Sequence, residues 1–144
     1  MVETILIPTD GSTDAERGVE QGLDLATKLG ATVHTLYVIE EGGNPWLSDP
    51  MEEQMEQARE YGQDILDDVT ERAAEHGIDC ETAVEASPAV HEKINDYVEE
   101  EEIDLIVMGS GYRGTMGGLL GSTAEKVLRS ADVPVMTIRR GGLD

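Results

Sequence analysis

Short apolar runs alternate along this chain with segments whose apolar residues recur every three or four positions. The runs predict buried strands, and the spaced segments between them predict helices that each bury one face. The predicted strands cover residues 4–8, 32–39, 82–84, 105–108 and 134–138. No linker or internal repeat interrupts the β-α-β-α-β-α-β-α-β order. The pattern therefore predicts one α/β domain over residues 1–144, with a parallel sheet and helices on both faces.

Capping and turn residues mark the expected helix ends. Serine or threonine followed three positions later by glutamate forms a capping box, and serine before proline offers an N-cap and an N1 residue. Glycine after the last apolar position favours a helix end, as at Gly30 and Gly77. The expected helix starts are Thr13 with Glu16, Asp49-Pro50, Ser87-Pro88, and Ser122 with Glu125.

Charge and cysteine content narrow the function classes. The chain has 144 residues, with 31 acidic and 10 basic side chains and a net charge of −21. Such a molecule repels the phosphate backbone, so we expect no nucleic-acid partner. No apolar run reaches the length of a membrane span. Cys80 is the single cysteine and the three histidines lie far apart, so no metal site is expected. The chain enters a strand without a leader-like segment, and we expect a cytoplasmic protein.

The acidity suggests adaptation to high salt. Self-repulsion at this charge destabilises a compact state in dilute buffer. At about 1 M salt the Debye length falls to ~3 Å and most of the repulsion is screened. We therefore hypothesise an intracellular, halophilic protein; the alternative is an acidic protein that works in ordinary salt.

Two polar segments follow predicted strands and are the candidate binding sites. The first is Pro8-Thr9-Asp10-Gly11-Ser12, and the second runs from Gly109 to Thr123. Ligands of open parallel sheets bind beyond the carboxyl ends of the strands. Glycine-rich backbone, the start of a helix at Ser122 and the cation Arg113 together favour phosphate binding. Alternatively, Ser122 only caps its helix and the glycines form a loop.

Two further residues have a binding and a structural interpretation. Asp10 could accept hydrogen bonds from a ribose or an adenine edge, or it could organise a turn through its own side chain. Val38 could offer its backbone to a base, or it could belong to the core. The sequence alone leaves both alternatives open.

Other enzymatic motifs are weak or missing. No Gly-Lys-Ser/Thr occurs, so there is no Walker A motif. Gly109-Ser110-Gly111-Tyr112-Arg113-Gly114 matches G-x-G-x-x-G, but more loop follows Gly114 and Asp132 precedes the last strand instead of ending it. An NAD(P)-dependent oxidoreductase is therefore a remote alternative. No nucleophilic triad or general base is evident, so we expect at most slow ATP hydrolysis.

Five short motifs are spread over nearly the whole chain: Ile-Pro-Thr-Asp-Gly-Ser, Leu-Tyr-Val-Ile-Glu, Asp-Leu-Ile-Val-Met-Gly, Leu-Leu-Gly-Ser-Thr-Ala-Glu-Lys-Val and Pro-Val-Met-Thr-Ile. Taken together, they resemble a universal stress protein domain. The resemblance implies an open sheet of strand order 3-2-1-4-5, of the adenine nucleotide alpha hydrolase-like type. It also implies a homodimer formed by pairing of the fifth strands around Val135 to Arg139.

The nucleotide-binding branch of that family carries G-x2-G-x9-G-(S/T). Here nine residues separate Gly111 from Gly121 and Ser122 follows, whereas the first half, Gly109-Ser110-Gly111, is one residue short. The resemblance implies ATP, or AMP or ADP, with Mg as a possible companion of ATP. Residues that it implies for the adenosine end and its flanks are Pro8, Thr9, Asp10, Val38, Met108 and Gly109. Those that it implies for the phosphates are Gly111, Gly121, Ser122 and Thr123.

The predicted function is an adenine-nucleotide-binding module of the stress response. The module would form a homodimer, and its nucleotide occupancy would alter a surface for an unknown protein partner. The alternative is a nucleotide-free dimeric scaffold of the same fold, with the shortened loop closed on itself.

Overall fold

The chain is described here from a computed structural model that covers residues 1–41, 52–111 and 120–139. Five parallel strands form one sheet of order β3-β2-β1-β4-β5, which confirms the expected fold class and strand order. The elements in chain order are β1 (Thr4–Pro8), α1 (Thr13–Leu29), β2 (Thr32–Glu40), α2 (Glu52–Glu75), β3 (Cys80–Ser87), α3 (Val90–Glu100), β4 (Leu105–Gly109), α4 (Ser122–Ser130) and β5 (Val135–Ile138).

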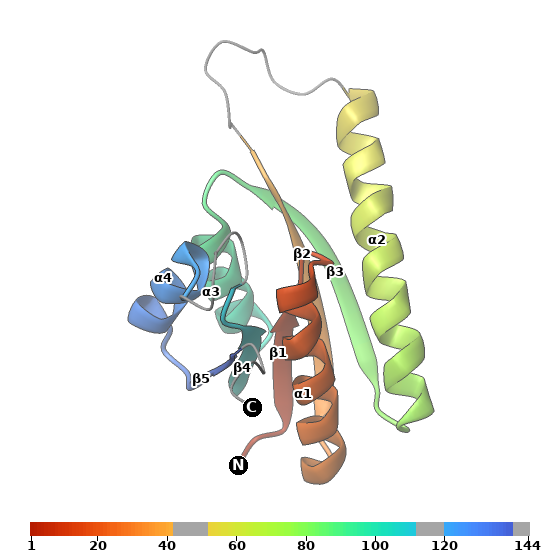
Figure 1. Cartoon of the computed structure of the whole chain (residues 1–144), viewed down its shortest axis with the longest axis vertical. Helices are drawn as coiled ribbons and strands as arrows, with labels where there is room; N and C mark the ends of the chain where they lie inside the picture. Colours follow the sequence, from red (N-terminus) through yellow and green to blue (C-terminus); the bar gives the residue numbers. More distant parts are fainter. Residues whose placement is uncertain (42–51, 112–119, 140–144) are drawn as a thin grey trace.

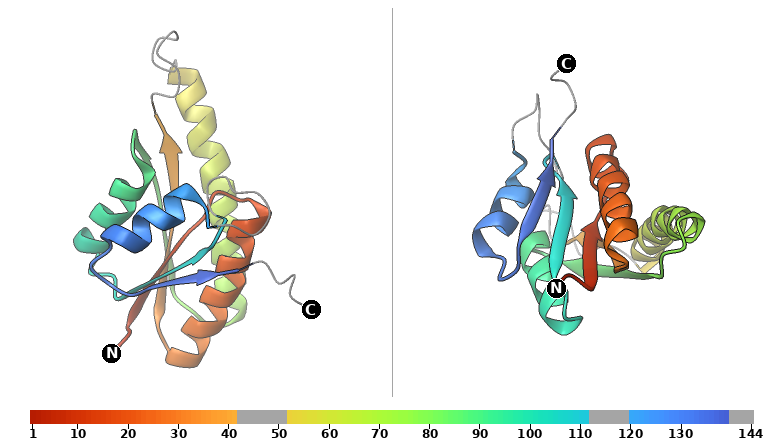
Figure 2. Two further views of the ribbon diagram at one scale, coloured as in Figure 1. Left: turned by 60° about the vertical axis from the view of Figure 1, so that its left-hand side comes forward. Right: turned by 90° about the horizontal axis from the view of Figure 1, so that it is seen from below.

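Helices cover both faces of the sheet (Figures 1 and 2). Successive residues of a strand point to opposite faces, so β1 sends Ile5 and Ile7 to one side and Leu6 to the other. Ile5 and Ile7 pack with buried residues of α1 and α2, such as Leu23 and Val69. On the opposite face Leu6 belongs to a second cluster, which includes buried residues of α3 and α4. This two-sided burial explains why the central strands read as continuous apolar runs.

The third strand is longer than its sequence suggested. We predicted residues 82–84, but β3 extends from Cys80 to Ser87 and pairs with β2 along its whole length. As an edge strand, β3 buries its side chains only partly, and it carries Glu81 and Glu85. These charged positions interrupt the apolar run, so the sequence showed only its centre.

Two predicted helix starts are shifted. The N-cap of α1 is Ser12, whose Oγ accepts a hydrogen bond from the Ala15 N–H at 3.1 Å, so the predicted Thr13/Glu16 box is wrong by one residue. Helix α3 begins at Val90, not at the predicted Ser87-Pro88. Ser87 is instead the last residue of β3, where its carbonyl oxygen accepts from the Glu41 N–H at 3.0 Å. The β2–β3 ladder thus holds Ser87 in extended backbone.

The glycine predictions at helix ends agree with the structure. Gly30 caps α1 in the left-handed conformation, with φ of 66°. Gly77 has φ of 71° and follows the last residue of α2, Glu75, by two positions. The predicted start of this long helix at Asp49-Pro50 lies outside the described residues.

Searches of the described residues for a membrane-spanning helix and for a metal-binding cluster found neither. None of the helices in residues 1–41, 52–111 and 120–139 has both the length and the apolar character that crossing a bilayer requires. Over the same ranges, no three His, Cys, Asp or Glu side chains are grouped to hold a metal ion. Cys80 is a free thiol of intermediate exposure.

Candidate functional site

The two polar segments meet at the carboxyl edge of the sheet. Strands β1 and β4 are neighbours, with Ile5 opposite Leu105, but their connections leave toward different sides of the sheet. The strand order reverses between them, and such a switch point opens a crevice for ligands. The chain leaves β1 after Pro8 and leaves β4 after Gly109, so both predicted segments start at this crevice.

The turn after β1 is built by its own side chains. Thr9 is buried; its N–H donates to the Leu36 carbonyl at 3.0 Å, and its Oγ1 accepts from the Gly11 N–H at 3.1 Å. The Asp10 Oδ1 accepts from the Ser12 N–H at 2.9 Å. Asp10 therefore has the turn-organising role that the sequence left open. Ser12 then caps α1, so one connected set of hydrogen bonds joins β1 to the helix.

The glycines at the end of β4 allow the first turn of α1 to approach closely. A Cβ at Gly109 would overlap the Asp14 carbonyl oxygen, and a Cβ at Gly111 would overlap the Asp14 carboxylate. On the helix side, a Cβ at Gly18 would lie 2.6 Å from the Gly109 nitrogen. These three glycines therefore have a packing reason that does not depend on a ligand.

The start of α4 differs from the predicted capping box. Gly121 is the N-cap and Ser122 is the first helical residue, so Ser122 does not cap the helix, and no side chain caps it among the described residues. The Glu125 N–H donates to the Gly121 carbonyl at 2.9 Å, and the Glu125 carboxylate pairs with Arg129 at 3.0 Å. The capping-box prediction at Ser122/Glu125 is wrong because glycine takes the cap position and the glutamate side chain turns to Arg129.

Backbone hydrogen bonds hold this helix start beside β4. The Gly121 N–H donates to the Ser110 carbonyl at 2.7 Å, and the Ser110 N–H donates to the Ile138 carbonyl at 2.9 Å. The first turn of α4 thus begins next to the end of β4, near the β1 turn. Ser122 is exposed and Thr123 is partly exposed. Free N–H groups at a helix start, together with hydroxyl donors, are a common way to bind phosphate.

The remaining predicted residues are placed as follows. Val38 and Met108 have fully buried side chains in the core under α3 and α4, so only their backbones could face a ligand. Val38 lies two residues beyond Leu36, the β2 partner of Pro8. Arg113 is outside the described residues. The structure therefore brings together the β1 turn, the end of β4 and the start of α4.

Of three further residues that shape this edge, sequence reasoning missed Asp14 and named Ser12 and Ser110 only as members of the two polar segments. Ser12 caps α1, Asp14 packs against the β4 glycines, and Ser110 is a buried polar residue that links β4 to both α4 and β5. Ser110 could have been suspected, because it directly follows an apolar run in the glycine-rich stretch. Asp14 had no local signal, since its contacts are made by a distant part of the chain.

Carboxylates dominate the side-chain charge around the crevice. Asp14 and Glu16 lie in the first turn of α1, and Asp14 pairs with Arg17 at 2.8 Å. Carboxylates in the first turn of a helix interact favourably with the positive end of the helix dipole, so these two side chains stabilise α1. The start of α4 carries no carboxylate before Glu125. An anionic ligand would therefore be favoured at α4 and disfavoured at α1.

A separate polar cluster lies between β2 and α3. The buried imidazole of His34 has its Nδ1 2.7 Å from the Tyr97 hydroxyl and its Nε2 3.1 Å from a Glu81 carboxylate oxygen. Burial raises the pKa of Tyr97 above its ordinary value, and the nearby glutamates, Glu101 first among them, raise it further. A phenol with a raised pKa stays neutral and is a poor nucleophile, so a catalytic role is not indicated. The contact between His34 and Tyr97 instead links α3 to β2.

Together, the strand order and the polar crevice define an open, doubly wound α/β domain of the class that binds ligands at a switch point. The universal stress protein family model matches residues 1–139, and the chain belongs to this family.

Individual relatives share most of their length with this chain. A universal stress protein of Methanocaldococcus jannaschii is 33% identical, over 97% of this chain and 84% of the relative. A universal stress protein family structure from Burkholderia pseudomallei has 27% identity and a TM-score of 0.81, covering 96% of this chain and 97% of that one. A family protein of Arabidopsis thaliana with AMP bound has 20% identity and a TM-score of 0.70, covering 97% and 93%. The last likeness shows the shared fold.

Proposed function

We propose that this protein is an adenine-nucleotide-binding module of the stress response that works as a homodimer. The observation that carries the proposal is the start of α4, which no described side chain caps and which a 2.7 Å hydrogen bond holds against the end of β4. The family protein with AMP bound gives a precedent for the ligand class. The predicted ATP, AMP and ADP share an adenosine and a phosphate, which are the two parts that this crevice could bind.

The residues present suit both ends of such a nucleotide. N–H groups at Ser122 and Thr123, with their hydroxyls, would hold phosphate and would replace the missing cap of α4. The β1 turn at Thr9 and Asp10, with Val38 beyond it on β2, would border the adenosine. Magnesium bound with ATP would supply positive charge beside the phosphates and so offset the surrounding carboxylates. The proposed chemistry is binding, with hydrolysis at most slow.

Nucleotide extraction and titration test this proposal. Purified protein is denatured and any released nucleotide is identified; AMP, ATP and NADH are then titrated in about 2 M KCl, where screening is strong. We expect adenine nucleotides to bind and NADH to bind far more weakly. Tight NADH binding would favour the oxidoreductase alternative.

Two matched serines locate the phosphate end. Ser122→Ala removes a hydroxyl at the start of α4, whereas Ser130→Ala makes the same change at its end. Losing one hydrogen bond to a charged group costs about 1.5–3 kcal/mol, so we expect roughly 10- to 100-fold weaker AMP binding for Ser122→Ala. Ser130→Ala should bind AMP normally. Gly121→Val, which places a branched side chain at the cap, should abolish binding in a protein that stays folded and dimeric.

One observation favours the alternative of a nucleotide-free scaffold. The packing of Asp14 already accounts for Gly109 and Gly111, so these two glycines do not require a ligand. A scaffold would carry no nucleotide after purification. It would also bind AMP and ATP no better than NADH, and the Ser122→Ala variant would then behave like Ser130→Ala.

Edge strand β5 supports the proposed homodimer. It ends the sheet, and an unpaired strand edge is a ready site for pairing with another chain. Met136 on β5 is 42% exposed, which gives this edge strand an apolar side chain at the surface. Pairing with a second copy about a two-fold axis would satisfy the strand edge.

Charge distribution also points to this side. Residues 120–139 hold two acidic side chains, Glu125 and Asp132, and three basic ones, Lys126, Arg129 and Arg139. The other residues of the chain carry 29 acidic and seven basic side chains. A near-neutral surface on so acidic a chain is what an interface between two copies needs, because like charges across it would repel.

A charge placed at the edge tests the dimer. Met136→Asp sets two carboxylates against each other across the two-fold axis, and we expect monomers by sedimentation in about 2 M KCl. Leu29→Asp, at an exposed position at the end of α1, is the matched control and should stay dimeric. An unchanged dimer in Met136→Asp would contradict the proposed interface.

A further inference from the structure

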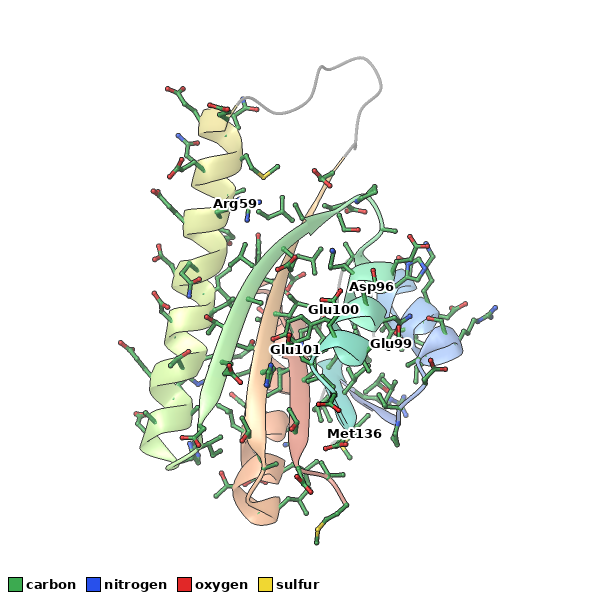
Figure 3. All side chains as sticks on the ribbon, turned by 180° about the vertical axis from the view of Figure 1, so that it is seen from behind. Arg59, Asp96, Glu99, Glu100, Glu101 and Met136 are labelled. Atoms are coloured by element: carbon green, nitrogen blue, oxygen red, sulfur yellow. The ribbon has the colours of Figure 1, made fainter. Side chains whose placement is uncertain are left out.

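We infer that the open edge of β3 is a docking site for an extended segment of another protein, one that carries Lys or Arg residues four positions apart. Such a segment would add a further strand to the sheet. Strand β3 ends the sheet opposite β5, so the inference depends on neither the proposed homodimer nor the nucleotide crevice. Figure 3, in which α3 lies in front of the sheet, shows β1, β2 and β3 in that order.

Backbone groups of β3 point alternately toward β2 and toward the open edge. The carbonyls of Asp79 and Ser87 accept hydrogen bonds of 2.9 and 3.0 Å from N–H groups on and just after β2. In a parallel ladder every second residue faces the same neighbour, so the odd-numbered residues of β3 pair with β2. The N–H and C=O groups of Thr82, Val84 and Ala86 therefore point to the open edge, where they are available to an added strand.

The side chains of β3 on the α3 side are acidic. The Glu81 carboxylate lies 3.1 Å from the His34 Nε2, and the Glu85 carboxylate lies 3.9 Å from the Lys93 Nζ. Even so, the Glu81 and Glu85 side chains remain 69% and 44% exposed. Ala83, between them, packs against the core. Two cations four residues apart on an added strand, about 13 Å, would therefore lie opposite the two carboxylates.

The opposite side of β3, which faces α2, is uncharged and includes the partly exposed Val84. The residues between the two cations of the partner would alternate between this side and Ala83, which favours small or β-branched side chains. A second copy of β3 does not fit this pattern. It would bring Glu81 and Glu85 to the same surface, and like charges opposite each other on neighbouring strands destabilise pairing.

A groove of about 520 Å³ continues the edge at the carboxyl end of β3. It is lined by residues 86–88 and by Glu92, Lys93, Asn95 and Asp96 of α3. The Asn95 Oδ1 is buried and has no hydrogen-bond partner among the described residues. Turned toward the groove, it would accept from a cationic donor, which the exposed Glu92 and Asp96 would also attract. The groove thus favours the same partner chemistry as the edge.

Two peptides of identical composition test the charge pattern by titration calorimetry with the full chain. The first, Thr-Val-Lys-Val-Thr-Val-Lys-Val-Thr, places both lysines on one side of a strand, four residues apart. The second, Thr-Val-Lys-Val-Thr-Lys-Val-Val-Thr, places them on opposite sides. About 0.5 M KCl screens the long-range attraction of any cation to this acidic chain. We expect the first peptide to bind about 3- to 5-fold more tightly than the second.

Matched protein variants separate the carboxylates from the backbone. Glu81→Gln with Glu85→Gln should weaken binding of the first peptide roughly 10-fold. Glu52→Gln with Glu56→Gln removes the same charge from exposed positions on α2 and should change binding less than ~2-fold. Val84→Pro removes an edge N–H, whereas Val84→Ala keeps it. We expect the proline variant to bind roughly 5-fold more weakly than the alanine variant.

Amide hydrogen exchange of the wild type gives a readout that needs no variant. The amides of Thr82, Val84 and Ala86 should exchange more slowly with the first peptide bound. No binding of the first peptide, equal affinity for both peptides, or edge amides that stay unprotected would each overturn the inference and leave the proposed homodimer in place. A dimer that persists in Met136→Asp but dissociates in Val84→Pro would also overturn it, because a second copy would then occupy this edge.

Discussion

Gly111 allows the packing of α1 and the binding of a ligand to be tested separately. A Cβ at this position would overlap the Asp14 carboxylate and would lie 2.7 Å from the Asp14 Cγ. The backbone of Gly111 is not left-handed, so alanine is penalised by the contact and not by its φ angle. To make room, the Asp14 carboxylate must rotate away from Arg17, which it contacts at 2.8 Å.

The expected cost follows from two effects. Overpacking a tight site costs about 1–3 kcal/mol, and losing a partly exposed ion pair costs about 0.2–1 kcal/mol. Because the obstacle is the end of a side chain that can rotate, we expect Gly111→Ala to lose about 1–2 kcal/mol of unfolding free energy. For a chain of this size that corresponds to a fall in Tm of roughly 3–7 °C.

A double-mutant cycle identifies the cause. Asp14→Ala alone loses the pair with Arg17 and a favourable charge in the first turn of α1, at a cost of about 1 kcal/mol. If the contact is the reason for glycine, adding Gly111→Ala to Asp14→Ala should cost almost nothing further. The resulting coupling energy would be about 1–2 kcal/mol, measured by urea unfolding in about 2 M KCl.

AMP affinity of the same double variant gives an independent readout. If Gly111 also lacks a side chain to let a phosphate approach, the double variant should be as stable as Asp14→Ala but should bind AMP more weakly than Asp14→Ala does. Additive costs, with a coupling energy near zero, would refute the packing explanation. Glycine would then be required by something other than Asp14.

Three further predictions concern stability and reactivity. Tyr97→Phe leaves a ring nitrogen of the buried His34 without its 2.7 Å partner, so we expect a loss of about 1–3 kcal/mol in chemical unfolding, and a neutral result would contradict this role. Raising KCl from about 0.1 to about 2 M should raise the Tm by roughly 10 °C, and a Tm that does not change with KCl would refute adaptation to high salt. Changing Glu52, Glu53, Glu56 and Glu60 to Gln should raise the Tm at low salt, because it removes part of the repulsion. Burial raises the pKa of the Cys80 thiol, so iodoacetamide should modify Cys80 more slowly than a free cysteine at pH near 8. Because the thiol of the unfolded chain loses its proton at a lower pH than the thiol of the folded chain, the unfolding free energy should fall as the pH rises above about 9.

Local patterns were sufficient where burial is two-sided and caps are short-range. Apolar runs predicted the central strands, and Gly30 marked the end of α1. Local patterns did not predict the full length of β3, because this edge strand carries glutamates that interrupt its apolar run. Cap assignments failed at Ser87 and Ser122 for a related reason. A serine with capping-box spacing does not have to be the N-cap. It can end the preceding strand, as Ser87 does, or follow a glycine that takes the cap position, as Ser122 does.

The sequence by itself determined the order of strands and helices, the acidity of the surface and the two polar segments that follow strands β1 and β4. Tertiary structure alone decided which of these residues meet. Asp14 lies against Gly109 and Gly111, and Ser110 joins α4 to β4, through contacts between residues far apart in the chain. Periodicity reports which face of an element is buried, but it does not report which neighbour covers that face. That choice depends on the sheet order and on the close approach of helices, which are properties of the whole fold.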